Sequence, residues 1–347
     1  MFKPNFCYTD SIVNNLTQIA AARELILNSP FVPKWEVVLR REAIIRRAHS
    51  STAIEGNRLS LEQVSELAHG REVMASRKDK QEVLNYLKVL ESIDKLTDGK
   101  RITEKNILQI QKMITQGTLE NLSDCGAYRT QYVVVGNRLT GEVIFRPPPN
   151  ENVPKLMKAL ILWLNSPDAQ ALDPVIEAGI AHYEFVRIHP FVDGNGRTAR
   201  VLATLILYLR GFDAKQFFCL DDYYDSDRQA YYKALQGIDQ KTLDLTNWLK
   251  YFTEGAKISI AAVKERVLRL SSERLRRTKK GQIALTERQM KIVEFINQQG
   301  GITNRDVRNM FKISSQAAHK ELVKLVMLNV IESVGKGRSL VYQIKTG

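Results

Sequence analysis

Cysteine is scarce in this sequence of 347 residues, and no two cysteines form a Cys-x-x-Cys pair. The three cysteines, Cys7, Cys125 and Cys219, and five scattered histidines do not have the spacing of a disulfide framework or a zinc cluster. Any metal ion bound by this chain is therefore expected to have oxygen ligands.

Long apolar runs are also missing. The most apolar segments, residues 159–164 and 201–209, are shorter than the roughly 20 residues that a membrane helix needs. Residues 1–10 lack the basic-then-apolar order of a signal peptide. We expect no membrane association and a cytoplasmic location. With 44% hydrophobic residues the chain can still bury a core, and its length favours two or three domains.

The net charge of +13 is concentrated toward the C-terminal end. Residues 264–347 contain 18 Lys and Arg against 7 Asp and Glu, a net charge of +11, whereas residues 1–263 contain 33 against 31. This asymmetry predicts a polyanionic partner for the C-terminal part, or else a basic surface that is merely solvated.

Helical patterns cover the first hundred residues. Capping residues, stop signals and apolar spacing predict helices at residues 10–28, 34–55, 60–70 and 79–96. The start near Ser60 is marked by a capping box with Gln63, three residues later. A further helix is expected at residues 103–116.

The pattern then changes to two short strands, residues 132–135 and 143–145, joined through a turn with Asn137, Arg138 and Gly141. A two-stranded hairpin is marginally stable alone, so we expect it to lie on the helical body. Its free edge either accepts an extended peptide by strand addition or belongs to a plain structural flap.

Helical patterns return after the hairpin, at residues 154–165, 174–188, 196–209, 228–235 and from residue 243 onward. Residues 264–280 are predicted to form a charged linker helix. Three helices and two strands then predict a winged helix-turn-helix, at residues 286–298, 303–310, 314–327, 330–334 and 340–344.

The loop before the helix at residues 196–209 carries a candidate phosphate site. Gly194 and Gly196 allow successive backbone N–H groups to turn toward one point at a helix N-terminus, forming a phosphate nest. Arg197 and Arg200 project from nearly the same face and can hold further phosphate oxygens. A positive charge at a helix N-terminus is unfavourable by roughly 0.3–1 kcal/mol for each arginine unless an anion is bound. The placement of the two arginines therefore indicates a polyphosphate ligand.

Two other residues of this loop suggest chemistry at the phosphate. Asp193 offers an oxygen ligand suited to Mg²⁺, which completes its shell with phosphate oxygens and water. His189 can take the proton from an attacking hydroxyl. The alternative is a loop whose glycines only turn the chain and whose arginines form structural ion pairs.

The string from His189 to Arg200 resembles the HxFx(D/E)GNGRxxR signature of the Fic family without a departure. The resemblance implies a mainly α protein: a Fic-fold helical core with a β-hairpin flap, followed by the winged helix domain. It also implies transfer of AMP from ATP, with Mg²⁺, to a Ser, Thr or Tyr hydroxyl of a target protein or of the chain itself. No GxxxxGK[ST] loop or kinase signature is present to indicate γ-phosphoryl transfer.

The resemblance assigns a role to each residue of the loop. His189 would be the general base, Asp193 the magnesium ligand, Gly194, Asn195 and Gly196 the anion hole, Phe191 an anchor, and Arg197 and Arg200 the holders of the β- and γ-phosphates.

Residues outside the loop also resemble nucleotide contacts of the family. The flap would cover the nucleotide near Val135 and Gly136 and align the target segment by strand pairing. Tyr231 and Tyr232 resemble the residues that flank adenine, although they fit the core equally well. Asp239 stands where some relatives have an asparagine that contacts the nucleobase, so the preference for adenine is less secure than the phosphate chemistry.

The segment from Ser51 to Asn57 resembles the inhibitory (S/T)xxxE(G/N) motif of the family. Glu55, followed by Gly56, is expected in the last turn of its helix, where the dipole disfavours a negative charge. In the family the partner of this glutamate is Arg200, and the same glutamate can position water for removing AMP. The alternative is an exposed glutamate before a glycine that ends the helix.

We therefore expect an N-terminal helical region with the inhibitory motif, a Fic catalytic domain, a basic linker helix and a winged helix domain, at residues 1–102, 103–255, 256–281 and 282–347. The expected partners are ATP, a target protein and DNA at the winged helix, with a homodimer left open. Two rival functions remain: a DNA-binding regulator, and transfer of another nucleotide or phosphate-containing group by the same loop.

Overall fold

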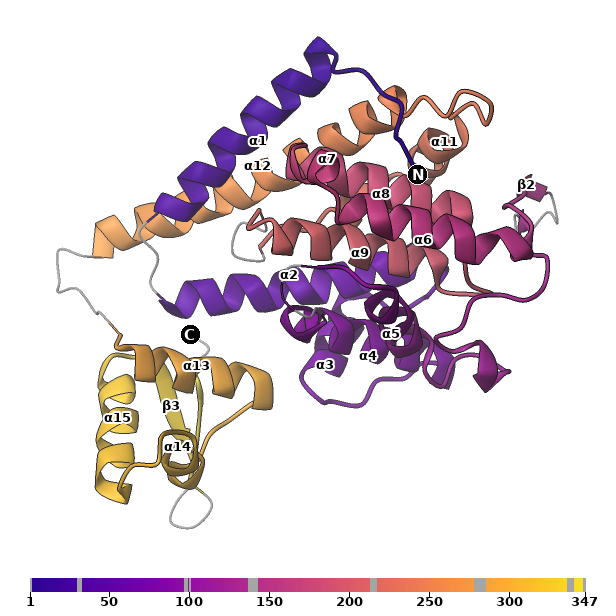
Figure 1. Ribbon diagram of the computed structural model, residues 1–347. Coiled ribbons are helices and arrows are strands. Elements are labelled where there is room, and N and C mark those ends of the chain that lie inside the picture. Colours follow the sequence, from indigo (N-terminus) through magenta and orange to yellow (C-terminus); the bar gives the residue numbers. More distant parts are fainter. Residues whose placement is uncertain are drawn as a thin grey trace. The chain divides into compact units, whose positions relative to one another are not determined.

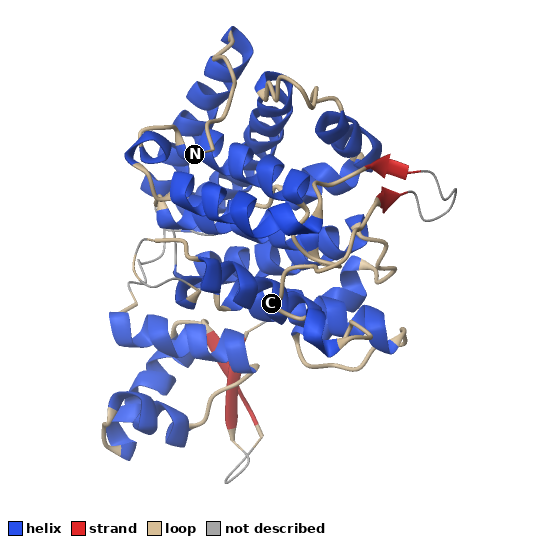
Figure 2. Ribbon diagram, turned by 45° about the vertical axis from the view of Figure 1, so that its right-hand side comes forward, coloured by secondary structure: helices blue, strands red, loops and turns tan. Residues whose placement is uncertain are grey.

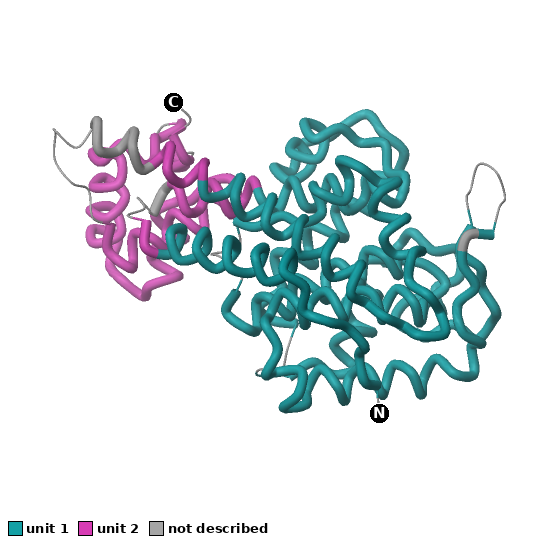
Figure 3. Tube along the Cα trace, turned by 90° about the horizontal axis from the view of Figure 1, so that it is seen from above, with its two compact units in different colours: residues 1–27, 43–264 teal, residues 28–42, 265–347 magenta. Residues whose placement is uncertain are grey.

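A computed structural model describes residues 2–29, 33–96, 99, 101–136, 143–212, 217–277, 285–335 and 340–345. The chain divides into two compact units (Figure 3), unit 1 with residues 1–27 and 43–264, and unit 2 with residues 28–42 and 265–347. The expected turn with Asn137, Arg138 and Gly141 lies outside the described residues, as do residues 336–339 between the two C-terminal strands.

Helices make up most of unit 1, as Figure 2 shows. In chain order they are α1 (Asp10–Asn28), the C-terminal part of α2 (Pro33–Ile54), α3 (Leu61–Ala68), α4 (Arg77–Glu91), α5 (Glu104–Thr115), α6 (Val153–Leu164), α7 (Pro167–Gln170), α8 (Pro174–Ile188), α9 (Asn195–Leu209), α10 (Asp221–Ser226), α11 (Arg228–Gln236) and the first part of α12 (Thr246–Arg277). Short 3-10 turns occur at Ile93–Lys95, Leu122–Asp124 and Asn150–Asn152.

The centre of unit 1 is the pair α8 and α9, which pack along each other (Figure 1), with α6 against α8 and α5 against α9. Both helices are buried on several sides, and Phe185, Val201 and Leu202 are fully buried. The helix predicted at residues 196–209 is thus confirmed as α9 and lies at the centre of unit 1. The loop between α8 and α9 is therefore held at both ends by the core.

The first strand of the hairpin was predicted wrongly. β1 covers Val135–Gly136, not residues 132–135, and pairs antiparallel with β2 (Val143–Phe145), Val135 opposite Phe145. In this register residues 132 and 133 would face the run of prolines at 147–149, which have no N–H for a ladder. The backbone oxygens of Thr130 and Gln131 instead accept hydrogen bonds from side chains.

The helix predicted at residues 79–96 is also corrected. α4 begins after Ser76, whose hydroxyl caps the helix by accepting a hydrogen bond from the Asp79 N–H at 3.0 Å. It ends at Glu91, because the Ser92 hydroxyl turns back to the Lys88 carbonyl and a 3-10 turn follows. The capping box of Ser60 and Gln63 is confirmed at the start of α3.

Unit 2 contains three helices and a strand pair: α13 (Glu287–Gln299), α14 (Asn304–Phe311), α15 (Ser315–Met327), β3 (Ile331–Val334) and β4 (Val341–Ile344). They share a core that includes Ile292, Val307 and Leu322, and Val37 of α2 packs against it. This order of elements is that of a winged helix-turn-helix. Among the described helices of the whole chain, none is long and apolar enough to cross a membrane.

Gly179 permits the close approach of α8 and α12. A Cβ at this position would lie 2.9 Å from Leu249 Cδ2, and the Trp248 indole N–H donates to the Gly179 carbonyl at 2.7 Å. We predict that Gly179→Val lowers the free energy of unfolding by about 3 kcal/mol through overpacking, measured by chemical denaturation. Ala262→Val at an exposed position of α12 is the control; equal stability of the two variants would contradict this packing.

Candidate functional site

His189 ends α8 in the left-handed backbone conformation, with φ 50° and ψ 59°. This confirms that the helix stops before Pro190. Its Nδ1–H donates to the Val186 carbonyl at 3.3 Å, so Nε2 keeps its lone pair. Burial lowers the pKa of His189 to about 4 from its ordinary 6.5. The imidazole is therefore neutral near pH 7 and can accept a proton at Nε2.

Arg129 holds the backbone around His189, a role that the sequence did not reveal. Its Nε donates to the His189 carbonyl at 2.8 Å, and its Nη atoms donate to the carbonyls of Gln131 and Pro148 at 3.2 and 2.5 Å. The Arg129 N–H also donates to the Pro190 carbonyl at 2.9 Å. One buried guanidinium thus ties the loop to both base segments of the hairpin. No local pattern marks such a long-range contact.

The rest of the loop is braced from within. The Asn195 amide accepts from the Phe191 N–H at 2.9 Å and donates to the Phe191 carbonyl at 2.8 Å. The Phe191 ring is fully buried, as an anchor should be. Gly194 has φ 81° and caps α9. The Asn195 side chain is therefore engaged within the loop. Its backbone N–H is the group that it can contribute to an anion site.

Asp193 and Arg197 lie together beside the start of α9. Asp193 accepts from the Gly194 N–H at 2.7 Å and from Arg197 Nη2 at 3.2 Å. Arg197 is 2% exposed and its Nη1 lies 3.6 Å from Glu82 Oε1 on α4. Arg197, predicted to bind phosphate, is thus already paired with two carboxylates.

Arg200 lies against the end of α2. Its Nη2 donates to Glu55 Oε1 and to the Ser51 carbonyl, both at 2.8 Å, and its Nε donates to the Ser51 hydroxyl at 2.7 Å. A Cβ at Gly196 would lie 2.3 Å from Glu55 Oε1, so any side chain there would collide with the carboxylate. The structure therefore brings the Glu55 carboxylate into the loop, directly over the predicted nest.

Further contacts fasten the turn that follows α2. Gly56 has φ 97°, a conformation that favours glycine. The Asn57 amide donates to Glu82 Oε2 at 3.1 Å, and the Tyr232 hydroxyl donates to the Ile54 carbonyl at 3.1 Å. Glu82 thus connects this turn to Arg197, while Glu55 connects it to Arg200.

The remaining predicted nucleotide contacts are more dispersed. Tyr231 is buried, stacks on Tyr224 with ring centroids 4.5 Å apart, and bonds through its hydroxyl to His182 Nε2 at 2.9 Å. Its neighbour Tyr232 is 40% exposed. The exposed Asp239 accepts backbone hydrogen bonds from Lys241 and Thr242, which lower its pKa. Tyr231 is therefore a core residue, and Asp239 caps a turn.

Val135 and Gly136 form β1 of the hairpin, as described above, and Val134 and Val143 are exposed beside them. Apolar side chains on an open hairpin edge are suited to pairing with an extended segment.

The oxygen ligands near the loop suit magnesium better than a metal that needs several protein ligands. No cluster of three or more His, Cys, Asp or Glu side chains occurs within the described ranges, so a divalent cation would have Asp193 as its protein ligand. Mg²⁺ commonly binds in this way, with one or two carboxylates and the oxygens of a phosphate substrate. The Asp193 carboxylate is 30% exposed beside the helix N-terminus, which fits that arrangement.

Residues 101–207 match the Fic/DOC family. This segment runs from before α5 into α9 and includes the hairpin and the whole loop from His189 to Arg197. These residues therefore form a segment similar to the Fic/DOC family. Ser51, Glu55 and Glu82 come from outside the matched segment.

Named relatives extend the likeness beyond this segment. Over 221 residues the chain is 29% identical to the protein adenylyltransferases Fic of Drosophila virilis and Drosophila melanogaster. The match covers 60% of this chain but 44% and 43% of those proteins, so it spans less than half of their length.

Solved structures show the same fold. A Fic family protein from Desulfovibrio desulfuricans G20 aligns over 100% of this chain and 99% of its own, with TM-score 0.66 and 24% identity. Fic-1 from C. elegans aligns over 74% of this chain and 72% of its own, with TM-score 0.58 and 26% identity.

We predict that His189 titrates near pH 4, because burial disfavours the imidazolium form. The ring should stay neutral as the pH falls through 6.5 and gain a proton only as it approaches 4. NMR of histidine-labelled protein measures this directly, with His189→Gln assigning the resonance. A midpoint near the ordinary value would show that the ring is solvated.

Proposed function

We propose that this protein transfers AMP from ATP to a hydroxyl side chain of a protein, either a target or the chain itself. The observation that carries the proposal is the loop from His189 to Arg200, where a neutral imidazole, a carboxylate and the N-terminus of α9 converge. The names of the Drosophila relatives support this activity.

In this reaction the hydroxyl oxygen forms a bond to the α-phosphorus while the bond from that phosphorus to the oxygen bridging to the β-phosphate breaks. Pyrophosphate leaves, and the hydroxyl proton passes to His189 Nε2. The backbone N–H groups of residues 194–196 and the guanidinium groups of Arg197 and Arg200 hold the phosphate oxygens. The hairpin at Val135 and Gly136 aligns the incoming segment by strand pairing.

A magnesium ion held by Asp193 and by phosphate oxygens would offset negative charge that develops on the leaving group. For the metal to bind, the hydrogen bond from Arg197 Nη2 to Asp193 Oδ2 has to be shared or released. Arg197 then turns from the carboxylate toward the phosphates.

We further propose that Glu55 restrains the enzyme. Its carboxylate accepts a hydrogen bond from Nη2 of Arg200, the guanidinium group that should bind the γ-phosphate. The same carboxylate lies over Gly196. ATP can then enter only with its phosphates displaced from the alignment needed for attack at the α-phosphorus. Misplacement by about 1 Å can cost ~100-fold in rate. Once AMP is attached to a target, the same carboxylate is placed to orient a water that removes it.

We predict that Glu55→Gly raises the rate of AMP transfer by at least about tenfold at saturating Mg-ATP, because coupling between such elements is commonly ~1–3 kcal/mol. Adding Arg200→Ala should abolish the gain, because the freed site needs its guanidinium. Incorporation of α-labelled ATP into protein measures both effects.

Glu62→Gly is the control. Glu62 is an exposed glutamate of the same N-terminal region, but it lies in the first turn of α3 and not at the loop. Equal labelling by the unchanged protein and Glu55→Gly would show that Glu55 is no restraint. Faster labelling from CTP, GTP or UTP than from ATP would instead favour another nucleotide donor.

A second candidate function is favoured by the surface of unit 2. Across α14 and α15 the described exposed residues include no acidic side chain, and the basic ones are Arg305, Arg308, Lys320 and Lys324. The acidic residues of these helices are engaged, Asp306 with the Thr303 cap and Glu321 with Gln289. We propose that this face binds duplex DNA, with α15 in the major groove.

We predict that the full chain binds duplex DNA with an affinity that falls steeply as salt rises. Replacing Lys320 and Lys324 by alanine should reduce the slope of log K against log salt by roughly 2, about one for each phosphate contact. Lys291→Ala, which removes a lysine paired with Glu287, should leave the slope unchanged. No binding at low salt would favour a protein-docking role for unit 2.

A further inference from the structure

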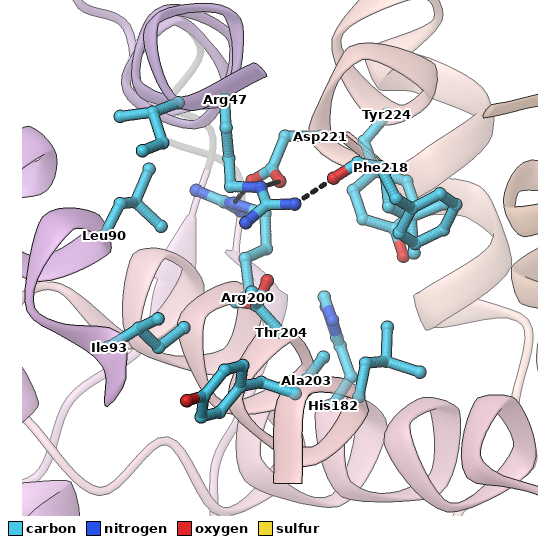
Figure 4. Close-up of a pocket in the computed structure, with 14 residues that line it drawn as sticks. Arg47, Leu90, Ile93, His182, Arg200, Ala203, Thr204, Phe218, Asp221 and Tyr224 are labelled. Carbon is cyan, nitrogen blue, oxygen red and sulfur yellow. Dashed lines mark hydrogen bonds and ion pairs between the residues drawn. The ribbon is translucent and has the colours of Figure 1, made fainter. Parts of the chain in front are cut away.

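A second carboxylate lies against Arg200, and neither the Fic signature nor the inhibitory motif includes it. Asp221, the first residue of α10, is 2% exposed. Its Oδ1 lies 3.4 Å from Arg200 Nε, and its Oδ2 lies 3.7 Å from Arg47 Nε on α2. The carboxylate therefore stands between two buried guanidinium groups, as Figure 4 shows.

Arg47 and Ser51 are four residues apart on α2 and share one face of the helix, and Glu55 follows after four more residues, in the turn directly after α2. Arg47 also donates through Nη2 to the Phe218 carbonyl. Arg47, Arg200 and Asp221 line a cavity of about 30 Å³ together with His182 and Tyr224. This charged group is thus enclosed by the core rather than by solvent.

The two carboxylates engage different edges of the Arg200 guanidinium. Glu55 occupies Nη2, and Nη1 lies 3.1 Å from the position of a Cβ at Gly196, so the Nη edge faces the loop. Nε donates its hydrogen to the Ser51 hydroxyl, and the Asp221 carboxylate lies beside this Nε edge as an ion-pair partner, on the side that faces the core. A phosphate arriving at the loop would displace Glu55 without meeting Asp221.

The charges of the buried group also give Glu55 and Asp221 different roles. With Glu55 in place, Arg47 and Arg200 are balanced by Glu55 and Asp221. When Glu55 leaves, Asp221 still balances one guanidinium and a single positive charge remains for the phosphate. Burial raises the pKa of the Asp221 carboxyl, while Arg47 and Arg200 oppose that shift and stabilise the carboxylate.

We infer that Asp221 is a positioning residue: it holds the Nε edge of Arg200 in one place in both states, while Glu55 and the γ-phosphate exchange on the Nη edge. This inference rests on the proposed binding of ATP at the loop. It assigns the orientation of the phosphate-binding arginine to a residue outside the loop and outside the inhibitory motif.

The test uses the full chain with Glu55→Gly, in which the Nη edge is free. Asp221→Asn is combined with Arg47→Gln, so that the net charge of the buried group does not change, and Arg47→Gln alone is the reference. Calorimetry gives the dissociation constants of ATP and AMP, and α-labelled ATP gives kcat and KM. Asp222→Asn is the control, since Asp222 pairs with Arg46 and Ser50 and not with Arg200.

Relative to Arg47→Gln alone, the double change should reduce the preference for ATP over AMP by about tenfold and lower kcat by a similar factor, an ordinary size for coupling between sites. AMP affinity should not change, because AMP has no γ-phosphate. Asp222→Asn should match the Glu55→Gly background in both measurements.

Equal ATP preference and kcat in the double variant and in Arg47→Gln would overturn the inference and leave Asp221 as a counter-ion for Arg47. If the background binds ATP without transferring AMP, the proposed reaction fails, yet the affinity comparison still decides the role of Asp221. Should thermal unfolding show that the double variant is unfolded, Asp221→Glu replaces it. That variant keeps the charge but not the distances, so a lower kcat is expected and an unchanged kcat contradicts the assignment.

Discussion

The buried guanidinium group of Arg200 sets the requirement that the rest of the site has to meet. Taking one partner from a buried ion pair typically costs about 3–5 kcal/mol, so a cation at this depth needs counter-ions in every state of the protein. Glu55 and Asp221 meet that need in the structure, and Ser51 adds two hydrogen-bond acceptors. Under the proposed function a phosphate takes the place of the partner that reaches the loop, so that one arginine would serve both restraint and catalysis.

The site therefore includes residues from outside the Fic signature. Residues 101–207 match the Fic/DOC family, yet both arginines of the loop are paired with carboxylates from outside that segment, Arg200 with Glu55 and Arg197 with Glu82. Asn57 joins the turn after α2 to Glu82, so the same turn touches the partners of both arginines. Motion of the end of α2 would thus affect both arginines that we propose to bind phosphate.

Features that depend on neighbouring residues in the sequence could be predicted, whereas most contacts between distant residues could not. The helical core, the capping box at Ser60 and the end of α8 before Pro190 all have local causes, and they were predicted correctly. The contact of Glu55 with Arg200 was expected through two short motifs and is present. Arg129, Glu82 and Asp221 contact partners on other elements of the chain, and Arg129 and His189, for example, are 60 residues apart. No local pattern indicates such contacts. The late start of β1 does have a local signal, since the prolines opposite residues 132 and 133 have no N–H for a ladder.

The central claim is that the loop from His189 to Arg200 transfers the α-phosphate with its nucleoside, and the fate of each phosphate tests it most directly. The purified Glu55→Gly variant is incubated with ATP that carries its label either in the α- or in the γ-phosphate, and incorporation into the variant itself is measured. The account predicts that protein becomes labelled from α-labelled ATP alone, and that His189→Ala in the same background prevents it while ATP binding persists. Label from the γ-phosphate, or undiminished labelling without His189, would contradict the account.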